Sequence, residues 1–236
     1  MVKDYIYKMM AGLHCKQAFH QLRVLEKKLV SAQARFALPF VYRGKGCFKT
    51  IEPRQNPLEI EELYKNVMEL SPTRVLEIGT ARGGTLYLWT QAAKTDATIV
   101  SVDLPEGEFG GAYPACRIPF YKAFALPGQK LHLLREDSHK DQTIEMVSKL
   151  FNHQPIDFAF IDGDHTYEGV KSDFLNYSPL VRSGGIICFH DILPRPDLPE
   201  IQVARFWKEV KNKYNSKEII GPDNSGRKIG IGLIYV

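Results

Sequence analysis

The sequence has no paired cysteines and no long apolar run, and both absences narrow the classes of protein it can belong to. Its cysteines, Cys15, Cys47, Cys116 and Cys188, are scattered without a CxxC pair, which argues against a disulfide framework or a zinc site and for free thiols in a reducing compartment. No apolar stretch approaches the roughly 20 residues that span a bilayer, and the beginning of the chain lacks the apolar region of a signal peptide. We therefore expect a cytoplasmic protein with no membrane partner.

The sequence also lacks internal repeats and strong charge, but its basic residues are unevenly placed. The formal net charge is +4, while residues 1–55 hold 11 Lys and Arg against three acidic residues. Such a basic head can bind phosphates, so an RNA-binding or RNA-modifying protein is one alternative. The head has no regularly interleaved aromatic residues for base stacking, and a solvated helix face is the simpler interpretation.

The first 50 residues are expected to form a helical extension and a linker before a domain at 51–236. One long helix is predicted over 5–36, and residues 37–57 read as a linker because they contain Pro39, Gly44, Gly46, Pro53 and Pro57. Apolar residues alternate three and four apart along the helix and form a heptad seam that must be covered, either by the same domain or by a second subunit. We favour the second subunit, and hence a homo-oligomer. The seam consists of Cys15, Ala18, Leu22, Leu25, Leu29, Ala32 and Phe36.

Strands and helices alternate regularly after residue 56, which predicts an α/β fold with a doubly wound, mostly parallel sheet. A helix follows Asn56, which is a plausible N-cap, and Pro57, which suits a first helical position. Two further strands at 217–220 and 229–236 are too close together for a crossover helix, so we expect them to be antiparallel. The earlier strands are predicted at 74–79, 98–104, 130–136, 156–162 and 185–190, and the helices at 84–94, 117–125, 142–152, 167–181 and 199–214.

A glycine-rich turn between the first strand and the next helix is the centre of the predicted site. It runs from Glu77-Ile78-Gly79 to Gly83-Gly84, where glycines let backbone approach a ligand and the helix start offers free N–H groups. Ala81 stands where the second glycine of the dinucleotide fingerprint G-x-G-x-x-G belongs. A nicotinamide-dependent oxidoreductase is therefore a second alternative, and it is not favoured.

Acidic residues end each of the five predicted parallel strands, and these ends meet at one edge of the sheet. Asp103 ends the second strand, where a carboxylate can accept from two ribose hydroxyls. Asp137 and Ser138 follow the third strand, where a carboxylate can accept from the amine of adenine. The fourth strand ends in Asp162-Gly163-Asp164-His165 and the fifth in His190-Asp191. Five such ends together favour a ligand site.

These motifs resemble the class I S-adenosylmethionine-dependent methyltransferases, over about residues 56–236. The segments 160–168 and 183–191 more narrowly resemble the small-molecule O-methyltransferase group, which includes macrocin O-methyltransferase-like and cephalosporin hydroxylase-like proteins. The resemblance implies a Rossmann-like, seven-stranded sheet with an antiparallel terminal strand, and O-methylation of a small-molecule hydroxyl. It also implies a donor site built from Glu77, Gly79, Thr80, Ala81, Gly83, Asp103, Leu104, Asp137, Ser138 and Asp162.

The chemistry of the acceptor side rests on fewer residues. An alcohol or phenol must lose its proton, and His165, with Asp162 beside the sulfonium, is the candidate for this step. In metal-dependent relatives, acids at these strand ends bind magnesium, and Asp162 and Asp191 match that pattern. His190 stands where relatives often carry a further carboxylate, which weakens the case for an oxygen-ligated ion. The loop at 105–121, with Phe109, Gly110, Gly111, Tyr113, Phe120 and Tyr121, is expected to form a lid or an apolar pocket wall.

Overall fold

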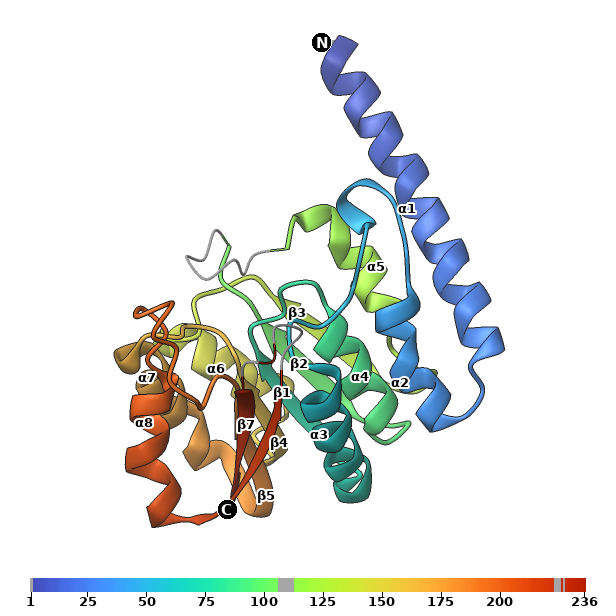
Figure 1. The fold of residues 1–236 in the computed structure, drawn as a ribbon. Helices are drawn as coiled ribbons and strands as arrows, with labels where there is room; N and C mark the ends of the chain where they lie inside the picture. Colours follow the sequence, from blue (N-terminus) through green and yellow to red (C-terminus); the bar gives the residue numbers. More distant parts are fainter. Residues whose placement is uncertain (1, 106–112, 223–225, 227) are drawn as a thin grey trace.

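The computed structural model describes residues 2–105, 113–222, 226 and 228–236, and its centre is a seven-stranded sheet (Figure 1). The strand order across the sheet is β3-β2-β1-β4-β5-β7-β6. The strands are β1 (Arg74–Ile78), β2 (Thr98–Val102), β3 (Lys130–Leu134), β4 (Ile156–Ile161), β5 (Val181–Phe189), β6 (Asn215–Pro222) and β7 (Lys228–Tyr235).

The first five strands run parallel, and the last two close the sheet in the opposite sense. β1 pairs in parallel with β2 and β4, and the parallel pairing continues to β3 and β5. β7 lies between β5 and β6 and is antiparallel to both. The predicted doubly wound sheet with its antiparallel terminal strand is therefore confirmed. The carboxyl ends of β1 to β5 share one edge, so the residues that follow them are brought together.

Helices cover both faces of this sheet, as Figure 1 shows. Three of them, α6, α7 and α8, pack on one face, and the others lie on the opposite side together with the N-terminal segment. The helices are α1 (Val2–Lys28), α2 (Ala32–Val41), α3 (Pro57–Leu70), α4 (Gly84–Ala92), α5 (Ile118–Lys122), α6 (Asp141–Leu150), α7 (Tyr167–Tyr177) and α8 (Val203–Val210), and the short 3₁₀ turns are η1 (Gly46–Phe48), η2 (Ala115–Arg117), η3 (Ser178–Leu180) and η4 (Lys211–Lys213).

The central strands are apolar on both sides because each side packs against helices. In β4, Phe158 and Phe160 belong to the apolar cluster under α1 to α5, whereas Ala159 and Ile161 belong to the cluster under α6 to α8. This alternation follows from the two-residue repeat of a strand. Trp89 and Trp207 are almost fully buried, one in each cluster.

Side-chain caps set the helix starts that flank the predicted site. The Asn56 side chain accepts from the Leu58 amide, and the Glu59 carboxylate accepts from the Asn56 amide, which completes a capping box at the start of α3. Thr166 caps α7 by accepting from the Gly169 amide. The chain segments that enter α3 and α7 are therefore fixed where they pass the edge of the sheet.

The prediction of a single helix over 5–36 is wrong, because the chain breaks between α1 and α2. Ser31 has an extended backbone and its side chain accepts a 3.1 Å bond from the Ala34 amide, so it is the N-cap of a new helix. The predicted linker also begins too early. Residues up to Val41 belong to α2, which contains Pro39 within its last turn.

The heptad seam is covered by the chain's own domain over the residues whose side chains the structure describes. Ala18 and Leu22 are buried, Phe36 is nearly so, and all three belong to the apolar cluster that contains α4. The seam therefore needs no second subunit to bury these residues, and the homo-oligomer stays a prediction. No helix in the described ranges is long and apolar enough to cross a membrane.

Candidate active site

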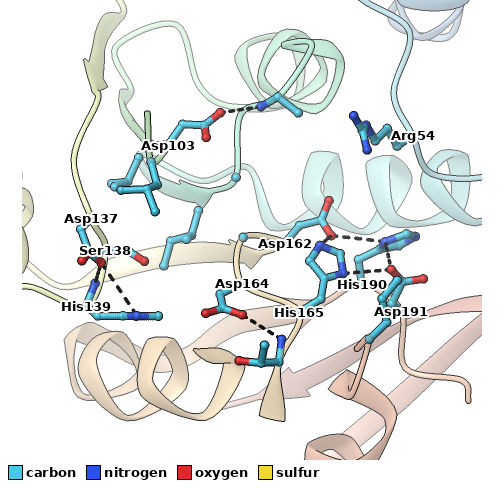
Figure 2. A pocket seen from close by; sticks show the side chains of 18 of the residues that line it. Arg54, Asp103, Asp137, Ser138, His139, Asp162, Asp164, His165, His190 and Asp191 are labelled. Carbon is cyan, nitrogen blue, oxygen red and sulfur yellow. Dashed lines mark hydrogen bonds and ion pairs between the residues drawn. The ribbon is translucent and has the colours of Figure 1, made fainter. Parts of the chain in front are cut away.

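A cavity of about 650 Å³ opens at the carboxyl edge of the sheet, where the predicted site lies (Figure 2). This volume is within the usual range of about 300–1,000 Å³ for small-molecule sites. Most of the predicted site residues line it, namely Gly79, Ala81, Asp103, Leu104, Asp137, Ser138, Asp162, His165 and Asp191. Glu77, Thr80 and Gly83 do not line this cavity. The structure thus brings together residues from the ends of five strands.

The glycine-rich turn approaches the end of β4 and the helix α5 so closely that side chains at Gly79 and Gly83 would not fit. Gly79 has a φ of 94°, and a Cβ there would lie 2.1 Å from the carbonyl oxygen of Asp162. Gly83 has a φ of 80°, and a Cβ there would meet the Tyr121 ring at 2.7 Å. Left-handed backbone of this kind favours glycine. The two glycines therefore let the turn sit directly over β4 and α5.

Asp103 holds this turn from the neighbouring strand. Its Oδ2 accepts bonds of 3.1 and 2.7 Å from the backbone amides of Thr80 and Ala81. The side chain is almost completely buried, yet it lines the cavity. The carboxylate predicted to bind ribose is therefore also the group that fixes the shape of the glycine-rich turn.

Glu77 supports the turn from beneath it instead of facing the cavity. The side chain is fully buried, and Ser101 donates a 2.6 Å bond to its Oε2. Ser101 is also 2.6 Å from the Thr80 hydroxyl, so the three side chains form a chain under the turn. Burial raises the pKa of Glu77 to about 8, because the charged carboxylate is costly away from water.

At the predicted adenine end of the cavity, the structure adds a residue that the sequence-based prediction missed. His139 lines the cavity after Asp137 and Ser138, and its Nε2 lies 3.3 Å from Oδ1 of Asp173. Asp173 is fully buried, and its carboxylate beside the ring is the largest cause of the raised pKa of the His139 imidazole. Tyr177 donates a 2.9 Å bond to the Ser138 carbonyl, which ties this loop to α7.

Two histidines and two aspartates meet at the opposite end of the cavity (Figure 2). His165 lies between the carboxylates, with Nδ1 3.1 Å from Oδ2 of Asp191 and Nε2 3.5 Å from Oδ1 of Asp162. His190 Nδ1 is 3.3 Å from Oδ1 of Asp162 and 3.6 Å from Oδ2 of Asp191. Asp191 has a φ of 57°, an unusual conformation for a residue other than glycine. This backbone conformation places the side chains of His190 and Asp191 at this edge.

The charges in this cluster are mutually stabilising. Burial acts to lower the pKa of both histidines, but the neighbouring carboxylates outweigh it, so the pKa of His165 is raised and that of His190 is raised strongly. Burial acts to raise the pKa of Asp191, but the nearby His190 and His165 hold it well below its usual value. The carboxylates and the imidazoles therefore favour each other's charged forms at the strand ends.

The segment before α3, which the sequence-based prediction treated partly as linker, and the first turn of α3 each supply one further polar side chain. Gln55 donates a 2.6 Å bond to Oδ2 of Asp162. Glu59, fully buried, places its Oε1 3.1 Å from Nε2 of His190. Arg54 and Arg195 also line the cavity, and Arg195 lies 3.4 Å from Oδ1 of Asp191. The sequence signals recognised at this segment were Asn56 as an N-cap and Pro57 at the first helical position.

The donor set at the predicted metal position does not fit magnesium. Asp162 and Asp191 are each within ion-pair distance of imidazole nitrogens, whereas Mg²⁺ takes oxygen ligands in near-octahedral geometry. Across the described ranges, no group of three or more His, Cys, Asp or Glu side chains is arranged to hold an ion. The imidazole rings supply the positive charge that these carboxylates face.

The loop expected to form a lid contributes less to the cavity than predicted. Its residues 106–112, including Phe109, Gly110 and Gly111, lie outside the described ranges. Tyr113, Phe120 and Tyr121 are buried in the apolar cluster on the α4 face and do not line the cavity, so the expectation of an aromatic pocket wall is wrong for these residues. Their bulk is used to pack α5 against α4 and the glycine-rich turn.

Comparisons with known proteins agree with this arrangement. Residues 76–192 match the family described as "Methyltransferase domain". The uncharacterized protein R132 of Acanthamoeba polyphaga mimivirus is 28% identical over 184 residues, which cover 72% of this chain and 77% of that protein.

Solved structures show the same fold at low sequence identity. The O-methyltransferase TomG of Streptomyces achromogenes, involved in tomaymycin synthesis and solved with S-adenosylmethionine, is 16% identical with a TM-score of 0.56, over 89% of this chain and 88% of that one. An O-methyltransferase of Bacillus cereus, solved with S-adenosylhomocysteine, is 15% identical with a TM-score of 0.57, over 86% and 97%. A methyltransferase family model therefore matches residues 76–192, and the chain shares the fold of these O-methyltransferases.

Proposed function

We propose that the protein is an S-adenosylmethionine-dependent methyltransferase that methylates a hydroxyl oxygen of a small molecule. The observation that carries the proposal is the 650 Å³ cavity at the carboxyl edge, which Gly79, Asp103, Asp137 and Asp162 line together. Its size suits a nucleoside-containing donor, and its carboxylates suit hydroxyl, amine and sulfonium groups. The methyltransferase domain and the O-methyltransferases of the same fold support the same conclusion.

When bound, S-adenosylmethionine supplies a methyl group already activated by the positive charge on sulfur. The protein then has to hold donor and acceptor in line, which can lower the barrier by about 7–11 kcal/mol in well-oriented systems. We assign donor binding to the predicted residues that line the cavity. Glu77, Thr80 and Gly83 act on the donor indirectly, because they shape the turn from outside the cavity.

The acceptor proton is assigned to the pair formed by His165 and Asp162. Oδ1 of Asp162 is buried and accepts no hydrogen bond among the described residues, and His165 Nε2 lies 3.5 Å from it. A hydroxyl placed there can give up its proton to the pair as its oxygen attacks the methyl group. Asp191, at 3.1 Å from Nδ1, positions the His165 ring and stabilises its protonated form.

Binding of S-adenosylhomocysteine tests the proposal directly. We expect this product to raise the melting temperature of the protein, whereas NADH leaves it unchanged. Stabilisation by NADH without stabilisation by S-adenosylhomocysteine would overturn the proposal in favour of an oxidoreductase. Steeply salt-dependent binding to RNA without binding of S-adenosylhomocysteine would favour the RNA-binding alternative instead.

Turnover on a panel of phenols, catechols and alcohols then tests the reaction. Release of S-adenosylhomocysteine identifies acceptors, and His165→Gln is expected to lose turnover while keeping its affinity for S-adenosylhomocysteine. Equal loss of binding and turnover would show that His165 has no separate role in proton transfer. We expect the activity to survive a strong chelator, because the side chains around Asp162 and Asp191 do not fit magnesium.

The remaining predictions complete the proposal. We propose a cytoplasmic protein with a helical extension at 1–50, a catalytic domain at 51–236, and a homo-oligomeric assembly through α1. The long N-terminal helix α1 supports the last point. The mass of the particle in solution, by light scattering on the full chain and on a variant lacking residues 1–11, tests the assembly.

A further inference from the structure

Two cysteines that lie far apart in the sequence meet beside the N-terminal extension. Cys47 in η1 and Cys116 in η2 are separated by 69 positions, yet their Sγ atoms are 3.2 Å apart. Figure 1 shows the pale blue turn of η1 next to the green segment that leads into α5. The scattered cysteines of the sequence therefore include one close pair of thiols.

Contacts that do not involve sulfur hold the two segments together. Arg117, next to Cys116, donates from Nε to the carbonyl of Cys47 and from Nη2 to the carbonyl of Thr50, the latter at 3.3 Å. The pairing of the thiols is therefore built into the packing of η1 against η2. Oxidation to a disulfide needs the sulfur atoms to approach by roughly 1 Å more, to the S–S length of about 2.05 Å.

We propose that Cys47 and Cys116 form a dithiol site that small disulfides, such as oxidised glutathione, convert into an intramolecular disulfide. The thiolate of Cys116 attacks one sulfur of the oxidant and expels one thiolate. The thiolate of Cys47 then attacks the Cys116 sulfur of the mixed disulfide and expels the second. The two cysteines lose two electrons to the oxidant, and their two protons pass to solvent.

The order of attack follows from the exposure of the two thiols. Cys116 is exposed and open to a dissolved oxidant, whereas Cys47 is partly buried. Burial, with the hydrogen bond to Cys116, raises the pKa of Cys47 to about 11, so that few Cys47 thiolates exist at neutral pH. The resolving step is therefore the slow one, and it accelerates as the pH rises.

The disulfide would tie the N-terminal extension to the segment that supports the glycine-rich turn. Arg117 Nη1 donates to the carbonyl of Arg82 at 3.4 Å, and Tyr121 donates to the carbonyl of Ala81 at 3.0 Å. The bond closes a loop of about 70 residues, which constrains the unfolded chain strongly. Oxidised protein should therefore melt at a higher temperature than reduced protein.

The test treats the full-length protein with oxidised glutathione and maps its disulfides after digestion with trypsin under non-reducing conditions. The four cysteines fall in four different tryptic peptides, so each pairing gives its own linked product. We expect the Cys47 peptide linked to the Cys116 peptide, and a melting temperature roughly 5–15 °C above that of the reduced protein. The shift should disappear on reduction.

Serine variants of the individual cysteines provide the matched controls. Cys15→Ser should still form the bond and show the shift, because Cys15 lies outside the pair, whereas Cys47→Ser and Cys116→Ser should show neither. A link from Cys15 to either partner, a stable glutathione adduct on Cys116, or unreacted thiols would each overturn the proposal. The readout on the wild-type chain does not depend on the folding of any variant.

Discussion

The side-chain amide of Gln55 donates a 2.6 Å hydrogen bond to Oδ2 of Asp162, although 107 positions of sequence separate the two residues. Gln55 itself is nearly buried and lies just before α3, outside the matched methyltransferase region. The bond fixes one oxygen of Asp162 and leaves Oδ1 directed at the histidines. The orientation of the proposed donor-side carboxylate is therefore set from outside the matched domain.

Replacing Gln55 should weaken binding of the donor product. In Gln55→Ala, Asp162 loses a charge-assisted hydrogen bond, and we expect the Kd for S-adenosylhomocysteine to rise about tenfold, or about 1.4 kcal/mol, by titration calorimetry. Gln129→Ala is the control, because Gln129 donates to the carbonyls of Thr90 and Lys94 away from the cavity. Equal changes of Kd in both variants would contradict the assigned role.

The charge of Glu59 should matter more than its capping function. Glu59→Gln keeps an oxygen for the capping box but removes the buried negative charge beside Nε2 of the protonated His190, and we expect a loss of about 3 kcal/mol in unfolding free energy. Glu62→Gln, which removes a surface pair with Lys217, should cost about 0–1 kcal/mol. Urea unfolding at neutral pH measures both, and similar values for the two variants would refute the prediction.

Asp103→Ala should lose the shape of the glycine-rich turn and a donor contact together. The backbone amides of Thr80 and Ala81 lose their acceptor, so we expect the Kd for S-adenosylhomocysteine to rise at least about tenfold. Asp96→Ala, at an exposed position between α4 and β2, is the matched control and should bind normally. Unchanged binding by Asp103→Ala would remove Asp103 from the proposed donor site.

Glu77 should make the protein less stable as the pH rises. Its pKa is about 8 when folded and about 4.3 in an unfolded chain, so the folded state holds the extra proton between these values. This contribution to stability is complete below the unfolded pKa and is lost as the pH rises through about 8. Glu77→Gln should therefore flatten the fall in urea midpoint between pH 6 and 9. Parallel curves for variant and wild type would contradict a protonated Glu77.

Asp157 should stabilise the fold in the opposite pH range. Burial acts to raise its pKa, but bonds from Arg182, Thr73 and the Arg74 amide outweigh it and lower the pKa. The contribution is therefore present above the unfolded pKa of about 3.9 and is lost as the pH falls through the lower folded value. Asp157→Asn should cost about 2–4 kcal/mol at pH 7 and much less near pH 3.

Asp141→Asn provides the comparison for Asp157, because Asp141 is an exposed aspartate in the first turn of α6. It should cost only about 0.3–1 kcal/mol, through the helix dipole. If the loss in Asp157→Asn were the same at pH 3 and pH 7, the ionised carboxylate would not be the stabilising form.

The features that could be predicted from the sequence are those that depend on apolar runs and on the lengths of the connections between them. The apolar runs before Gly79, Asp103 and Asp162 predicted parallel strands, and parallel strands place their carboxyl ends on one edge. The cavity residues at these ends followed from that geometry alone. The antiparallel end of the sheet followed from the short connection between the last two strands.

What the sequence-based prediction missed depends on contacts between distant segments. Nothing near Gln55 or Glu59 in the sequence marks Asp162 or His190 as a partner, and only the packing of α3 against α4, β6 and β7 brings them together. The break before α2 was missed because Ser31 interrupts a heptad that continues on both sides. Tyr121 was assigned to a pocket wall since an aromatic residue looks the same in the sequence whether it faces a cavity or a core.

The place of β7 has a consequence for how the chain is completed during synthesis. β7 leaves the ribosome after β5 and β6, yet it sits between them and pairs with both. Until its final residues emerge, β5 presents an unpaired apolar edge and β6 has no strand to join. A nascent chain stalled before residue 228 therefore exposes an open sheet edge, which makes early release of the chain a direct route to aggregation.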